Sequence, residues 1–252
     1  MKFRILIFVL FLFKGFGPAQ AADVEAPLAV FREANAAYRA GDYEKSVSLY
    51  ENLVAERHGN AAVFYNLGNA HFKKKKVGRA ILYYEKAKHL KPRDRDLAAN
   101  LEYVQSLLEY RVEDKRNWYV KTGEALLRAF TEQEIGIVAF AFGLAFLFSW
   151  GFLLHFRPTS TWSWRMKTLL WVAVVFFSFF TAKGLYHGGV REAVVLKTKA
   201  RVRYGPSNKD QIAFRLGEGI KVRIKKQTEG WSRVVLANGE TGWMDQEEIG
   251  VV

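Results

Sequence analysis

The side chains best suited to specific recognition recur on two stretches in the N-terminal half of the chain. Residues 29–56 and 63–92 superpose with a shift of 34 residues, which aligns Asn35 with Asn69, and arginine or lysine residues accompany both asparagines. Amide side chains can hydrogen-bond to the backbone of an extended peptide, and cationic side chains can bind its carboxylates. This combination predicts binding of an extended peptide that has an acidic end.

Nothing in the sequence predicts a catalytic centre. The chain contains neither a phosphate-binding glycine loop nor a serine nucleophile motif, and its lack of cysteine excludes thiol catalysis, disulfides, cysteine metal sites and a lipoprotein anchor. Its five histidines show no metal-ligand spacing such as His-x-x-x-His: His58, His71, His89, His155 and His187. We therefore expect no catalytic residues, no metal and no cofactor, and we expect that the protein is not an enzyme.

The formal net charge of +13 does not indicate a nucleic-acid-binding protein once it is divided along the chain. Residues 22–134 contain 19 basic and 17 acidic side chains, and residues 191–252 contain 12 and 8. Neither region has the excess of cations that a phosphate-binding surface needs. Nucleic acid is therefore not an expected partner.

The 34-residue period itself predicts pairs of helices. The second copy resembles the tetratricopeptide (TPR) repeat, in which small residues allow two antiparallel helices to approach. The residues that carry the resemblance are Phe64, Leu67-Gly68, Ala80, Tyr84, Ala87 and Pro92. The first copy is less regular, with Ala34 and Ser46 at two of the small positions. A third segment, from Asp94 to about Glu113, has the pattern of a single capping helix. We expect a TPR domain over residues 27–115.

The resemblance to TPR proteins also implies where a peptide would bind. In that family the first helix of each pair lines a concave groove. By register, the candidate groove residues are Arg32, Asn35, Tyr38, Arg39, Tyr65, Asn66, Asn69, Phe72 and Lys73. The alternative is that the two repeats only pack against a neighbouring domain.

Two apolar stretches predict a pair of membrane spans. Residues 135–154 contain no charge and are long enough to cross a bilayer core of about 30 Å, so we place the first span at 135–156. The second, 168–187, reaches spanning length only if Lys183 extends to the lipid headgroups. The turn between them, 157–167, carries basic but no acidic residues, which predicts a cytoplasmic location.

The N-terminus sets the orientation of these spans. Residues 1–21 have the charged start, short apolar core and Ala19-Gln20-Ala21 end that are typical of a cleaved signal peptide, and an uncleaved anchor is the alternative. Either would place both soluble regions on the extracytoplasmic side of the bacterial inner membrane. Residues 116–134 are amphipathic, which predicts a linker helix or a helix at the membrane–water interface.

After Gly188-Gly189 the apolar period changes from helical to alternating, which predicts short strands separated by turns. Asn238-Gly239 between two such runs predicts a hairpin. Residues 191–252 resemble a bacterial SH3-like domain through Ala-Arg-Val-Arg-Tyr-Gly-Pro at 200–206, Leu-Gly-Glu-Gly at 216–219 and Asn-Gly-Glu-Thr-Gly-Trp at 238–243. This resemblance implies a small β-barrel, and Arg203 and Tyr204, beside a loop, are its candidate surface-binding residues.

The predicted fold is a multidomain membrane protein with α-helical TPR repeats, a two-helix transmembrane hairpin and a C-terminal SH3-like β-barrel. This order of domains resembles the E-type members of the Bat (Bacteroides aerotolerance) family across the whole chain. The resemblance implies a membrane scaffold beside von Willebrand A-domain membrane proteins and a MoxR-type ATPase, linked to envelope stress or aerotolerance. Two alternatives stay open: a cell-wall sensor or anchor whose SH3-like domain binds peptidoglycan while the repeats recruit an effector, and a subunit of a membrane enzyme.

Overall fold

The computed structural model describes residues 22–156, residues 191–252 and a few single positions between 164 and 178. The chain divides into two compact units, Met1–Gly59 and Asn60–Val252. The predicted signal peptide lies outside the described residues, as do most of the predicted turn at 157–167 and most of the predicted span at 168–187.

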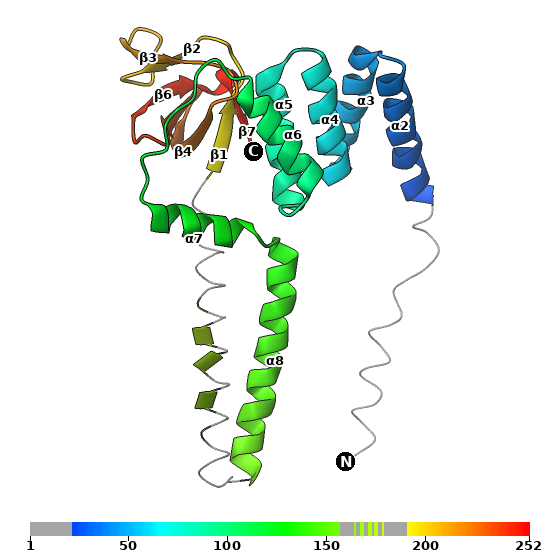
Figure 1. Ribbon diagram of the computed structural model, residues 1–252, viewed down its shortest axis with the longest axis vertical. Coiled ribbons are helices and arrows are strands. Elements are labelled where there is room, and N and C mark those ends of the chain that lie inside the picture. Colours follow the sequence, from blue (N-terminus) through cyan, green and yellow to red (C-terminus); the bar gives the residue numbers. More distant parts are fainter. Residues whose placement is uncertain are drawn as a thin grey trace. The chain divides into compact units, whose positions relative to one another are not determined.

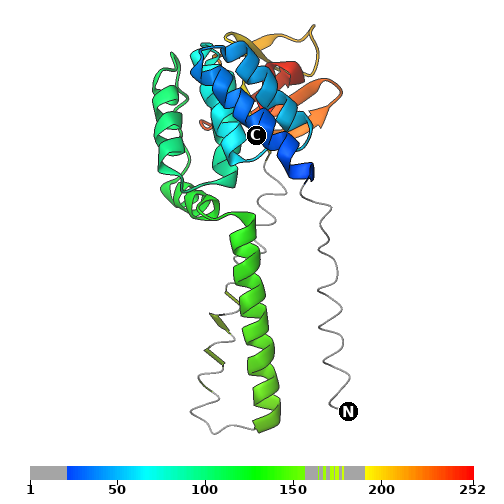
Figure 2. The same cartoon turned by 90° about the vertical axis from the view of Figure 1, so that its right-hand side faces the viewer.

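The described residues of the first unit, from Ala22 on, form an antiparallel helix pair, α2 (Ala22–Arg39) and α3 (Tyr43–Ala55). The two helices lie side by side, as Figures 1 and 2 show in blue. Asp42 begins α3 by accepting a hydrogen bond from the backbone nitrogen of Lys45 at 3.0 Å. Ala34 and Ser46 are fully buried, so these small residues allow the close approach that the repeat pattern predicted. The first helix begins at Ala22, five residues before the predicted start of the TPR domain.

The second unit begins with another helix pair, α4 (Ala61–Lys73) and α5 (Val77–Leu90), followed by α6 (Arg95–Ser106). Gly68 is needed for the close packing of α4 on α5, because a Cβ atom there would lie 2.7 Å from the ring of Tyr84. The single helix α6 packs against α5, as predicted for a capping helix. It ends at Ser106 rather than near Glu113, because the chain beyond it leaves the helices and Val112 packs against the core of the sheet.

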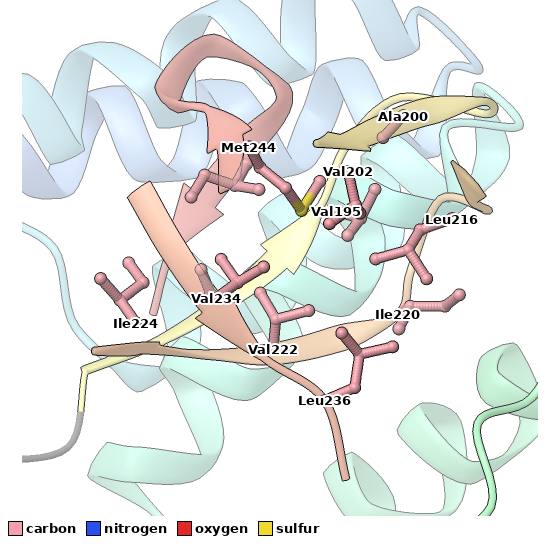
Figure 3. Packing of buried hydrophobic residues seen from close by; sticks show 12 residues of the cluster. Val195, Ala200, Val202, Leu216, Ile220, Val222, Ile224, Val234, Leu236 and Met244 are labelled. Carbon is pink, nitrogen blue, oxygen red and sulfur yellow. The ribbon is translucent and has the colours of Figure 1, made fainter. Parts of the chain in front are cut away.

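The C-terminal part forms a seven-stranded antiparallel sheet in the order β3-β2-β6-β5-β4-β1-β7. Its apolar side chains converge from different strands on one core, for example Val195, Val222 and Met244 (Figure 3). The strands are β1 (Arg191–Val195), β2 (Ala200–Arg203), β3 (Ile212–Leu216), β4 (Lys221–Thr228), β5 (Trp231–Val235), β6 (Thr241–Asp245) and β7 (Ile249–Val251).

Turn residues explain how this sheet closes its hairpins. Gly239 has a φ of +94°, and the chain reverses there between β5 and β6, which confirms the hairpin predicted at Asn238-Gly239. Gly230, with a φ of +71°, turns the chain between β4 and β5 in the same way. The alternating runs of the sequence at 193–196, 200–204, 220–224, 232–236 and 242–244 correspond to β1, β2, β4, β5 and β6. Strands β3 and β7 were not predicted.

Residues 116–134 form two helices and not the single amphipathic linker helix that we predicted. The first is α7 (Trp118–Arg128), and a new helix, α8 (Glu132–Phe156), follows after three residues. Thr131 and Glu134 explain the break, because each side chain accepts a hydrogen bond from the backbone of the other residue. The hydroxyl of Thr131 accepts from the backbone nitrogen of Glu134. The carboxylate of Glu134 accepts from the backbone nitrogen of Thr131 at 2.9 Å. This reciprocal capping box starts a helix.

The helix predicted for residues 135–156 is present as α8. Its role as a membrane span is not confirmed: within the part of the chain that the structure describes, no helix combines the length and the hydropathy needed to cross a membrane.

Candidate functional site

The candidate groove residues of the first helix pair have different environments. Arg32 and Arg39 are exposed, and Tyr38 is half-buried with its ring 5.4 Å from that of Tyr43. Asn35 is also half-buried, and its Oδ1 accepts a hydrogen bond of 2.7 Å from the hydroxyl of Tyr50 on the other helix of the pair. The two arginines therefore present their charge to solvent, while Asn35 helps to join the helices.

The second pair repeats this arrangement at the equivalent positions. The Oδ1 of Asn69 accepts a hydrogen bond of 2.6 Å from the hydroxyl of Tyr84. The ring of Tyr65 lies 5.9 Å from that of Tyr84. In the first pair, the ring of Phe31 lies at the same distance from that of Tyr50. An asparagine–tyrosine hydrogen bond at the same place in both pairs indicates a structural role for each asparagine within its own pair.

Helix α6 covers part of the predicted groove surface of α4. The hydroxyl of Tyr65 accepts a hydrogen bond of 2.6 Å from the side chain of Asn100, and the ring of Phe72 contacts that of Tyr103 at 5.9 Å. Asn66 is half-buried, and Lys73 is exposed. Among the nine candidates, Arg32, Arg39 and Lys73 are thus the exposed side chains that can bind a carboxylate.

The two candidate residues of the SH3-like domain differ in their exposure to solvent. Arg203 is not a surface residue as predicted, because its side chain is only 7% exposed and its Nη1 donates to the backbone oxygen of Asp210 at 2.5 Å. It therefore holds the connection between β2 and β3. Tyr204 is 73% exposed and remains available for binding.

An apolar junction between helix α5 and the sheet was not foreseen from the sequence. Helix α5 packs against β1 and β7 (Figure 1). Val194 of β1 is fully buried within the helical core, beside Ile81 and Leu82 of α5, and Leu196 and Val252 pack against the same core. The second TPR pair and the SH3-like domain therefore share one hydrophobic interface.

Three glycines allow the helices and the sheet to come this close. A Cβ atom on Gly78 of α5 would lie 2.7 Å from the backbone oxygen of Val195, and one on Gly219 would lie 2.6 Å from the side chain of Leu108. A Cβ atom on Gly250 of β7 would overlap the side chain of Leu82. The backbone nitrogen of Gly78 also donates to the carboxylate of Glu218 at 3.1 Å.

Beside this apolar contact lies a network of ion pairs that links α5, β1, β4 and α7. The Nζ of Lys221 lies 3.0 Å from a carboxylate oxygen of Glu85 and 3.1 Å from one of Glu192. Arg128 pairs with both Glu192 and Glu124 at 2.5 Å. Arg116 completes the network by pairing with Glu124 and with Asp114. We call these seven residues the ionic cluster.

The cluster is held in its charged form. Burial would raise the pKa of Glu192, but the positive charges of Lys221 and Arg128 lower it to about 2. Burial would lower the pKa of Lys221, but Glu85 and Glu192 raise it above its ordinary value. The hydrogen bond from Arg116 likewise lowers the pKa of the Asp114 carboxyl. These groups stay ionised near neutral pH and compensate one another.

A cavity of about 880 Å³ lies against the ionic cluster, between the end of α5, helix α7 and strands β1, β4 and β5. Apolar side chains such as Phe130 and Val235 line it together with the cluster. Further cations at its wall include Lys88 and Arg223. The cavity is a mixed apolar and cationic recess at the junction of the helices and the sheet.

No local pattern in the sequence indicates this junction. Glu85 lies between a tyrosine and a lysine on a helix, which is typical of a solvated surface, and yet it is only 4% exposed. Gly78 is separated from a run of four lysines only by Val77 and has the appearance of a turn residue. A glycine at the second position of an otherwise regular helix is the feature that could have indicated a close contact there.

Replacing Gly78 with alanine should weaken the junction by about 2 kcal/mol, because the new Cβ atom would meet a backbone oxygen that cannot rotate away. Denaturant unfolding of the purified protein would measure this loss. The matched control is Gly123→Ala in α7, where nothing lies within 4 Å of the added Cβ atom, so alanine should leave stability equal or slightly higher. Equal stability of the two variants would contradict a tight junction at Gly78.

Comparison with known families agrees with this architecture. Residues 31–95 match the family described as tetratricopeptide repeat, and residues 197–250 match the family described as bacterial SH3 domain. The chain therefore has TPR repeats followed by a C-terminal bacterial SH3 domain, as predicted, and the repeats imply protein partners. A search among curated proteins found no match to the chain.

Proposed function

We propose that this protein is a non-enzymatic scaffold of the bacterial cytoplasmic membrane that presents TPR repeats and an SH3 domain on the extracytoplasmic side. The observation that carries the proposal is the junction at which α5 packs against β1 and β7. Two recognition modules joined by a flexible linker would move independently. Here the second helix pair and the SH3 domain share a core and an ionic cluster, so a partner bound to one is held at a fixed position relative to the other.

This arrangement has a consequence for binding. A partner that contacts both modules loses its translational freedom once, and its second contact forms at high effective concentration. A rigid connection strengthens that effect when the spacing of the modules matches the partner. The proposal therefore needs no chemistry other than recognition.

The membrane location rests on apolar exposure and on the sequence. Several large apolar side chains of α8 are highly exposed, including Ile137 at 70%, Phe140 at 70% and Phe148 at 77%. Large apolar side chains exposed to this extent are unfavourable in water and favour an apolar surrounding. The signal-peptide pattern of residues 1–21 and the basic residues of 157–167 favour the orientation proposed.

The partners proposed are von Willebrand A-domain membrane proteins of a Bat-type complex, with a role in envelope stress or aerotolerance. This part rests on the order of domains alone. The second candidate function, a cell-wall sensor or anchor, is favoured by one observation, the 73% exposure of Tyr204 on the bacterial SH3 domain. An exposed aromatic ring can stack on a sugar or a peptide of the wall.

Removing the exposed cations of the first helices should reduce partner capture at least tenfold. In the triple variant Arg32→Gln, Arg39→Gln, Lys73→Gln, each lost charge removes a charge-assisted hydrogen bond, worth about 1.5–3 kcal/mol when it is made to a carboxylate. The measurement is affinity purification of the tagged full-length protein from its native membranes in mild detergent, with quantification of the proteins recovered.

A matched control removes the same charge elsewhere. Arg57→Gln, Lys76→Gln, Lys91→Gln changes three exposed cations that lie outside the candidate groove, and it should retain its partners. Equal recovery from both variants would exclude the first-helix faces as the binding surface. If the wild-type protein is recovered without protein partners but sediments with purified sacculi, and Tyr204→Ala abolishes that sedimentation, the cell-wall function replaces the scaffold.

A further inference from the structure

Helix α7 has its polar and apolar sides reversed with respect to an ordinary surface helix. Glu124 is only 9% exposed and is turned toward the protein, where it pairs with Arg116 and Arg128. Trp118 is 77% exposed, and Leu126 is 53% exposed. In a helix of a water-soluble surface, the charged side chains would face solvent and the apolar ones would face the core.

The ionic cluster fixes this orientation. Arg128 binds Glu192 of β1 through two hydrogen bonds of 2.5 and 3.0 Å, so α7 cannot rotate about its axis without breaking them. At about 100° per residue, Leu126 lies roughly 160° around the helix from both Glu124 and Arg128. The apolar side of α7 is therefore held away from the sheet.

The outward side of α7 carries no charge. By the same helical spacing it consists of Trp118, Tyr119, Thr122, Gly123 and Leu126, all of them exposed. The hydroxyl of Thr122 donates a hydrogen bond to the backbone oxygen of Trp118 at 3.0 Å, which reduces the polarity of this side of the helix further. Glu124 and Arg128 face the sheet. Lys121, the third charged residue of the helix, is exposed, but by helical spacing it lies on the same side as these two, and its Nζ donates to the backbone oxygen of Asp114 at 2.8 Å.

We propose that the outward side of α7 lies on the surface of a phospholipid bilayer. Tryptophan and tyrosine prefer the headgroup region, because an apolar ring and a polar group are both satisfied there. The chain turns only at residues 129–131 and continues into α8, which exposes large apolar side chains such as Ile137 and Phe140. We therefore expect the outward side of α7 and the exposed side chains of α8 to meet the same surrounding. This inference rests on the membrane location in the proposed function and adds which element contacts the headgroups.

A protein partner fits this surface less well than lipid. An 11-residue helix is about 16 Å long, and one side of it offers far less than the roughly 800 Å² per partner that stable protein interfaces bury. A bilayer needs no such minimum, because each ring contributes independently. Since the ionic cluster also joins α7 to β1, contact of α7 with lipid would set the orientation of the SH3 domain relative to the membrane.

The test uses the absence of cysteine from the chain. Single variants Leu126→Cys and Thr122→Cys would carry an environment-sensitive NBD fluorophore on the outward side of α7, and Tyr204→Cys would carry the same label at an exposed position of the SH3 domain as a matched control. The labelled full-length protein is placed in phosphatidylethanolamine–phosphatidylglycerol nanodiscs. We expect blue-shifted emission at 122 and 126 that brominated lipids quench and aqueous iodide does not, and the opposite behaviour at 204.

Each other outcome overturns the inference in a recognisable way. A protein that enters the discs but has a water-like, iodide-quenched probe at 126 contradicts contact between α7 and lipid while leaving the membrane location intact. A protein that does not enter the discs contradicts both. A blue shift without quenching by brominated lipids, together with a doubled mass of the protein in the disc, would show that a second copy of the chain, and not lipid, contacts the outward side of α7.

Discussion

Replacing Lys221 with methionine should destabilise the second unit by about 3 kcal/mol at pH 7. Lys221 is the cation between Glu85, 4% exposed, and Glu192, 9% exposed. Methionine keeps the length of the side chain but leaves these buried carboxylates short of one positive charge, and losing one partner of a buried ion pair costs about 3–5 kcal/mol. We take the lower value because the Lys221 side chain itself is 29% exposed, so water can partly replace it. Denaturant unfolding measures the difference.

Charge, and not packing, should account for that loss. The double variant Glu85→Gln, Lys221→Met removes one carboxylate together with the lysine and should recover more than half of the stability. The loss of stability caused by Lys221→Met alone should become smaller as the pH falls from 7 to 4, because carboxylates that lack the lysine can take up protons. Lys225→Met, an exposed position on the same strand, is the matched control and should change stability by less than about 0.5 kcal/mol. A pH-independent cost would show that the ionic cluster is not the cause.

The features predicted correctly from the sequence depend on contacts close together in the chain. A shift of 34 residues aligned Asn35 with Asn69, and the structure has the same hydrogen bond to a tyrosine 15 residues later in both pairs. The predicted turn at Asn238-Gly239 also acts within a few residues. Patterns of this range are visible in one sequence because the residues concerned recur at fixed spacing.

The junction and the burial of Arg203 could not be predicted in this way. Lys221 and Glu85 are separated by 136 positions, and no periodic pattern indicates that they meet. Arg203 occupies a strand end, where an arginine is usually exposed, and only the return of the chain at Asp210 supplies the oxygen that it binds. Periodicity indicates which residues form an element, whereas the partner of a charged residue depends on the tertiary arrangement.

The orientation of helix α7 also could not be predicted from a local pattern. Its amphipathic pattern was recognised, but amphipathicity does not tell which side faces the protein. The position of Glu192 decides this, because it draws Arg128 inward. The prediction of a linker helix over 116–134 also missed the Thr131–Glu134 capping box, which separates α7 from α8.

The stability of the TPR region should fall steeply in mild acid because of His71. This histidine of α4 is 2% exposed, with its ring stacked on that of Tyr83 at 5.3 Å. Burial, together with the positive charges of Arg79, Lys74 and Lys76, lowers its pKa from 6.5 to about 4. Because the pKa is lower in the folded state, the unfolded chain binds a proton first as the pH falls. The stabilisation is therefore complete above pH 6.5 and is lost progressively down to about pH 4.

His71→Phe should remove this dependence, because phenylalanine keeps a ring against Tyr83 but cannot take up a proton. Between pH 7 and pH 4 we expect the wild-type protein to lose about 3 kcal/mol more of its free energy of unfolding than the variant does. Denaturant unfolding followed by the helical circular dichroism signal at both pH values measures the difference. Arg79→Gln should reduce the loss in part, since Arg79 is the largest of the charge contributions, whereas Arg95→Gln removes an equal charge on α6 and should not. A wild-type protein and a His71→Phe variant that lose stability in parallel would show that His71 is protonated in the folded state as readily as in the unfolded one.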